Sequence, residues 1–120
     1  MIRARLHSIE SPDLDLEREE PSNREDFGIP VTALVGADDL PGGDLFEFFV
    51  CTPSWIAAKV LGKSHLFAHG YLVVAKYEYV TIRTAIQNLV SHTTGDTWQD
   101  VAGKLGRYAV WEFHDYRPLR

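Results

Sequence analysis

The chain is poor in cysteine and has no long apolar run. Cys51 is the one cysteine among 120 residues, which excludes an internal disulfide framework and a cysteine-based zinc site. No stretch approaches the ~18 consecutive apolar residues that a membrane-spanning helix needs. Met1 is followed by Ile-Arg-Ala-Arg and not by an apolar segment, so we expect no secretory signal and a cytoplasmic location. Apolar residues make up 45% and charged residues 24%, values typical of a globular protein, and we expect one domain over residues 1–120.

Motifs that bind phosphates or carry out catalysis are also missing. The sequence contains no Gly-x-Gly-x-x-Gly, no P-loop and no Gly-x-Ser-x-Gly elbow. His65 and His69 are four residues apart but have no third ligand near them, so we expect no metal ion and no cofactor. Cys51 precedes an expected helix N-terminus, a position that lowers the pKa of a thiol, although a cysteine buried as a small apolar residue is more common. A small enzyme that uses Cys51 or a histidine therefore stays open as an alternative.

Acidic residues are concentrated in two segments. Residues 10–26, the acidic segment, contain eight acids and two bases and are expected to form a loop. Residues 37–48 contain four acids and no base. Such segments repel phosphates, so we expect neither a nucleic acid nor an anionic membrane as partner, and a basic protein is favoured. The simpler interpretation is that acidic loops keep a small domain soluble.

The first half of the chain predicts three strands and a helix. Residues 2–9 alternate apolar and polar, and residues 27–36 and 45–51 are rich in β-branched and aromatic residues. The third strand is apolar on both faces, which favours a central place in the sheet. Pro30 indicates that the second strand lies at an edge or begins after the proline. Thr52 and Pro53 predict a helix start with a capping hydroxyl, and Gly62 its end.

The second half predicts a strand, two helices and a last strand. The apolar run 71–75 is typical of a buried strand, and residues 79–93 carry an apolar stripe at helical spacing. Thr97 and Asp100 predict a capping box for a helix over 98–105, with Gly106 as its stop. A strand over 108–114 and a tail over 117–120 follow. The order β-β-β-α-β-α-α-β predicts an α+β fold: a single two-layer domain with a mostly antiparallel sheet of about five strands and two to three helices on one face.

Two motifs carry a resemblance to a known family. One is Val-Cys-Thr-Pro-x-Trp, at residues 50–55, and the other is Arg-Tyr-x-x-Trp-Glu-Phe-x-Asp-Tyr, at residues 107–116. With the Leu-Val-Val run at 72–74 and the Gly-Asp-x-Trp turn at 95–98, they make the chain similar to the immunity 8 family of bacterial polymorphic-toxin immunity proteins. The resemblance implies a small cytoplasmic protein that binds and silences a toxin in the producing cell, and it supplies no catalytic residues.

The resemblance and the charge pattern together predict the function. We expect a non-enzymatic inhibitor that binds the C-terminal domain of a cognate toxin and covers a basic, nuclease-like active site with an acidic surface. The other alternative that stays open is a structural adaptor without a toxin partner. Nothing in the sequence indicates an oligomeric state. The residues expected to contact the toxin are Asp38, Asp39 and Asp44 in the hairpin turn and Glu17, Glu19 and Glu20 in the acidic segment.

Overall fold

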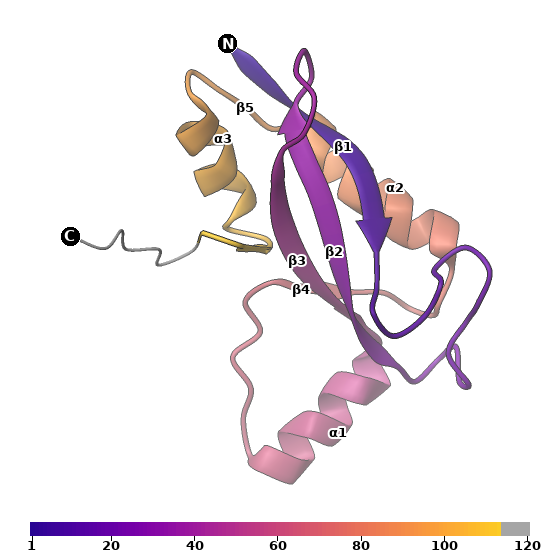
Figure 1. Ribbon diagram of the computed structural model, residues 1–120. Helices are drawn as coiled ribbons and strands as arrows, with labels where there is room; N and C mark the ends of the chain where they lie inside the picture. Colours follow the sequence, from indigo (N-terminus) through magenta and orange to yellow (C-terminus); the bar gives the residue numbers. More distant parts are fainter. Residues whose placement is uncertain (114–120) are drawn as a thin grey trace.

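The structure is a computed structural model that describes residues 1–113 (Figure 1). Its strands are β1 (Ile2–Glu10), β2 (Gly28–Ala37), β3 (Asp44–Cys51), β4 (Tyr71–Val73), β5 (Thr94–Gly95) and β6 (Val110–Trp111). Its helices are α1 (Pro53–Lys63), α2 (Tyr79–Ser91) and α3 (Trp98–Leu105). The predicted α+β fold and element order are confirmed, with the two-residue β5 added between α2 and α3. His114, expected at the end of the last strand, and the tail at 117–120 lie outside the described residues.

The strands form one sheet in the order β4-β3-β2-β1-β5, with β6 paired to β3. Every pair is antiparallel except β3 with β4. The central position predicted for β3 is confirmed, since it pairs with β2 as well as with β4 and β6. The strand predicted over 71–75 is present as β4, but its predicted length and burial are wrong, because β4 spans three residues at the edge of the sheet and its Val73 is half exposed.

The expectation drawn from Pro30 is also wrong, because β2 begins before the proline and lies between β1 and β3. Pro30 is paired with Phe49 of β3, whose N–H donates to the carbonyl of Gly70 at 2.8 Å on the other side of β3. The nitrogen of Pro30 therefore points away from β3. In that direction β1 has already ended, since its last partner in β2 is Thr32. Proline is accommodated because this stretch of a central strand has no neighbour that needs its missing N–H.

One face of the sheet carries the core. Phe46, Phe48 and Val50 of β3 are buried together with the apolar stripes of α2 and α3 in a single cluster. The cluster takes from the two helices Ile82, Ile86, Val90, Val101, Ala102 and Leu105. A bulge in β1 between Leu6 and Ser8 shifts its alternation, so that Ile9 is buried as well. The capping box of Thr97 and Asp100 at the start of α3 is confirmed.

Helix α1 departs from this arrangement and extends from the end of the sheet, away from α2 and α3 (Figure 1). None of its residues is buried. The hydroxyl of Thr52 does not cap it, because that oxygen instead accepts the N–H of Phe27 at 3.2 Å. The helix ends one residue later than predicted, at Lys63, where Ser64 takes a left-handed conformation with φ of 73°. None of the three described helices is long and apolar enough to cross a membrane.

The side chain of Trp55 joins α1 to the sheet. Its ring lies 4.7 Å from the ring of Phe49 and 6.3 Å from that of Tyr71, measured between centroids. It also covers Gly28 of β2, where an added Cβ would lie 2.5 Å from Trp55 Cε2. The absence of a side chain at residue 28 therefore creates the seat of the indole.

Replacing Gly28 with alanine should destabilise the protein, because the new methyl displaces the Trp55 ring. We expect the free energy of unfolding to fall by about 1–3 kcal/mol in urea titrations. Gly62→Ala is the matched control, since a Cβ there meets nothing within 4 Å and alanine favours the helix by up to about 1 kcal/mol. A Gly28→Ala protein as stable as the wild type would contradict this packing of Trp55.

Candidate functional site

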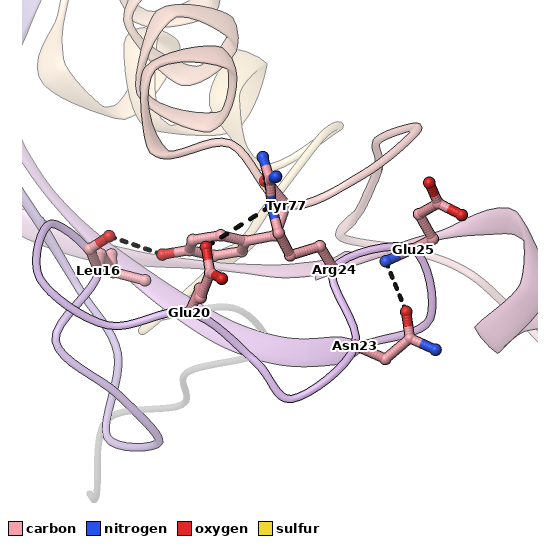
Figure 2. Close-up of polar contacts among 6 residues, drawn as sticks. All are labelled: Leu16, Glu20, Asn23, Arg24, Glu25 and Tyr77. Carbon is pink, nitrogen blue, oxygen red and sulfur yellow. Dashed lines mark hydrogen bonds and ion pairs between the residues drawn. The ribbon is translucent and has the colours of Figure 1, made fainter.

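The acidic segment is held in place by Tyr77, two residues before α2 (Figure 2). The Tyr77 hydroxyl donates to the carbonyl of Leu16 at 2.7 Å. The guanidinium of Arg24 donates to the Tyr77 carbonyl from Nε at 3.1 Å and from Nη2 at 3.0 Å, and the Tyr77 N–H donates to the Arg24 carbonyl at 2.7 Å. The edge of the tyrosine ring contacts Phe27, with 5.4 Å between centroids. One buried residue thus ties two separate turns of the segment to the body.

The environment of Tyr77 keeps its hydroxyl a donor. Burial raises the pKa of Tyr77 above its usual value, and the nearby Tyr79, Asp15 and Glu20 raise it further. The phenol therefore stays protonated at neutral pH, as its bond to the Leu16 carbonyl requires.

Several acids of the segment build its turns. The Asp15 carboxylate accepts the N–H groups of Glu17 at 3.2 Å and Arg18 at 3.3 Å, and the Glu19 carboxylate accepts the N–H of Asp15 at 2.7 Å. Glu20 forms an exposed ion pair with Arg24 at 3.6 Å. After Glu10, which ends β1, the segment has no helix or strand, yet hydrogen bonds within residues 15–19 and 23–26 hold its turns, so it presents its charges in a defined arrangement.

The segment encloses an open hollow of about 560 Å³. Five acidic residues line it, and neither lysine nor arginine does. Its apolar walls come from Ile9, Leu14, Leu16 and Tyr79, and its acidic lining from Glu10, Asp13, Asp15, Glu17 and Glu19. Two of the predicted contact residues, Glu17 and Glu19, are therefore brought together here, with the Glu17 carboxylate accepting the Tyr79 hydroxyl at 3.2 Å. An arrangement of this kind suits a cationic side chain.

The other predicted group lies at the opposite end of β2. Asp38 and Asp39 are exposed in the hairpin turn of residues 38–43. Glu10, at the start of the acidic segment, pairs with Thr32 of β2, six residues before Asp38, which corresponds to roughly 20 Å at the usual rise of a strand. Arg5 and His7 line the same shallow hollow as Asp38 and Asp39, so the hairpin end is less uniformly acidic. The six predicted residues thus do not form one surface patch.

Asp44 has a visible role inside the fold. Its Oδ2 atom accepts the indole N–H of Trp98 at 2.7 Å and that of Trp111 at 3.0 Å. The carboxylate thereby ties β3 to α3 and β6, and Trp111 in turn stacks on Phe46 of the core. Sequence reasoning singled out the charge of Asp44 and did not find this clamp, which links residues more than 50 positions apart.

Two features considered for catalysis were an activated Cys51 and a metal site. Cys51 is fully buried, and this burial raises the pKa of its thiol to about 11, so little reactive thiolate exists at neutral pH. Within residues 1–113, no group of three or more His, Cys, Asp and Glu is placed to hold a metal ion.

Replacing Asp44 should therefore affect stability. Asp44→Ala leaves two half-buried indole N–H groups without their charged acceptor, and we expect the free energy of unfolding to fall by about 2–3 kcal/mol. Asp39→Ala removes the same charge from the exposed hairpin turn and should leave stability within about 0.5 kcal/mol of the wild type. Equal effects in urea titrations would argue against the clamp.

Removing the hydroxyl of Tyr77 should loosen the acidic segment. In Tyr77→Phe the Leu16 carbonyl loses its donor, and we expect a loss of about 1–2 kcal/mol in stability together with faster trypsin cleavage after Arg18 and Arg24. Tyr108→Phe is the control, because Tyr108 is exposed and lies outside the segment. Cleavage at the wild-type rate in Tyr77→Phe would show that the hydroxyl does not hold the segment.

Comparison with known families identifies the kind of protein to which the chain belongs. The family model described as Immunity protein 8 matches residues 4–116, nearly the whole chain. No curated protein and no solved structure matches it. The family implies an immunity protein that binds a cognate toxin, a non-enzymatic inhibitor role. The chain belongs to the immunity protein 8 family.

Proposed function

We propose that this protein neutralises its cognate toxin in the cytoplasm by one-to-one binding, with the acidic segment as the main contact. The observation that carries the proposal is the hollow in that segment, whose five carboxylates have no lysine or arginine among them. Unbalanced charge of one sign on an ordered surface attracts a partner of the opposite sign and speeds its association.

The hollow favours a lysine or arginine side chain of the toxin. Its apolar walls suit the aliphatic stem of such a side chain, and its carboxylates suit the cationic head. A toxin that cleaves nucleic acid needs a positive cleft to hold phosphates, so a segment of this charge would compete for that cleft. We therefore propose a nuclease-like toxin whose basic active site is covered by the acidic segment.

Asp38 and Asp39 remain a predicted second contact, which a toxin bound at the hollow would reach along the second half of β2. The acidic segment ranks first because Arg5 lies with the hairpin aspartates and no base lies in the acidic hollow. Glu17, Glu19 and Glu20 are proposed to add to the same field while also bonding within the segment.

Two double charge reversals test which end binds. Glu10→Lys with Asp13→Lys changes the hollow, and Asp38→Lys with Asp39→Lys changes the hairpin turn by the same total charge. None of these four carboxylates accepts a hydrogen bond or forms an ion pair among the described residues, so neither variant should unfold the chain. We expect the hollow variant to bind the cognate toxin at least tenfold more slowly and to fail to protect cells that make this toxin. The hairpin variant should lose less than threefold.

The association rate should also be measured at low and high ionic strength. For the wild type it should fall steeply as salt is added, and the hollow variant should lose much of that dependence. A salt-independent rate, or full binding by the hollow variant, would refute the acidic contact. Titration of toxin activity separates inhibitor from enzyme, because a stoichiometric binder protects fully only at a one-to-one molar ratio, whereas a catalyst acts below it.

A further inference from the structure

The arm, which we define as α1 and the return segment to Gly70 (residues 53–70), extends away from α2 and α3 (Figure 1). Its last residues rejoin the body through bonds of His69 to the Gly106 carbonyl and of the Phe49 N–H to the Gly70 carbonyl. No residue of α1 is buried, and near the end of the arm Leu61 and Phe67 are 86% and 88% exposed. A helix of 11 residues is marginal in water when no packing supports it. Only its first turn is secured to the sheet, through Trp55. The outer end of the arm is thus an apolar surface in need of a partner.

The arm differs in charge from the rest of the chain. Residues 53–70 contain two lysines and no acid, in a protein whose net charge is −5. Acids lie instead at the base of the arm, where the Ser54 hydroxyl donates to the Glu25 carbonyl at 2.9 Å and approaches the Asp26 carboxylate at 3.1 Å. Lys63 ends the helix, about 15 Å away at 1.5 Å per residue, so it cannot reach these acids in its own chain.

We propose that the arm is the contact between two copies of this chain. A two-fold axis that sets the two α1 helices antiparallel brings the exposed Leu61 of each copy onto the apolar arm of the other. The same pairing places Lys63 of one copy beside Glu25 and Asp26 of the second, and it does so twice. Each end of the helix then meets the opposite charge, which a parallel arrangement would not provide.

A second copy suits the arm better than a toxin with a basic cleft. Lys63 would repel such a cleft, and Lys59, whose ammonium lies 5.1 Å from the centre of the Trp55 ring, adds to the repulsion. The acidic surface that the arm needs exists on the chain itself. The acidic hollow stays accessible in this dimer, because Glu25 and Asp26 do not line it.

Sedimentation velocity over a concentration series tests the pairing. The apparent mass should rise from 13.6 kDa toward twice that value for the wild type. Leu61→Asp, with or without Phe67→Asp, should keep the protein a monomer at tenfold higher concentration. Val80→Asp is the matched control, because Val80 is 71% exposed on α2 and lies outside the arm, and it should associate like the wild type. All three positions are exposed, so the melting temperatures of the variants should agree with that of the wild type at concentrations too low for association.

A charge exchange tests the antiparallel geometry. Lys63→Glu and Glu25→Lys should each weaken association at least fivefold, and the double variant should restore it. A monomeric wild type, a dimer that Leu61→Asp leaves intact, or a double variant weaker than either single variant would each overturn the proposal.

The toxin assay keeps this test separate from the proposed function. Leu61→Asp should protect cells as the wild type does, since the acidic hollow is unchanged. Loss of protection by Leu61→Asp together with a monomeric wild type would instead assign the arm to the toxin and overturn the pairing of two copies.

Discussion

The hold of Tyr77 on the acidic segment is the interaction on which the proposed toxin-binding surface depends. Eight acids in residues 10–26 repel one another, and a loose chain would spread them apart. Tyr77 prevents this with a hydroxyl that reaches Leu16 and a backbone that exchanges bonds with Arg24. The hydrogen bonds and packing of the buried Tyr77 offset the repulsion between the crowded carboxylates, so the charges stay concentrated around one hollow.

The apolar core and the charged surfaces occupy different parts of the fold. The core face of the sheet, covered by α2 and α3, contains the buried apolar side chains, and none of the charged groups discussed above lies within it. The acidic segment precedes β2 and the hairpin turn follows it. Helix α1 follows β3 and projects from the end of the sheet (Figure 1). Surfaces at strand ends can change in charge without disturbing the core, which suits a protein whose partner determines its surface.

The sequence predicts the parts of this fold that depend on neighbours along the chain. The stripe of α2 and the capping box of α3 follow from spacing alone, and both were found. The prediction from Pro30, an edge strand or a later strand start, was wrong because the environment of Pro30 depends on where another strand, β1, ends. The roles of Asp44 and Tyr77 were missed for the same reason, since each joins residues that only the fold brings together. The acidic charges were visible in the sequence, but their division into two ends was not.

Opposite charges on one small chain constrain how it can associate. A uniformly acidic surface would keep two copies apart by charge repulsion. Here the arm contains no acid, and acidic residues lie where it joins the body, so the lysines of one copy can pair with the acids of the other. Because Glu25 and Asp26 lie at one end of the acidic segment and the hollow is built from the other, pairing through the arms leaves both hollows accessible. A dimer of this form presents two independent acidic sites, so each copy can still bind one toxin. The proposed pairing would then add stability without covering the surface that we propose binds the toxin.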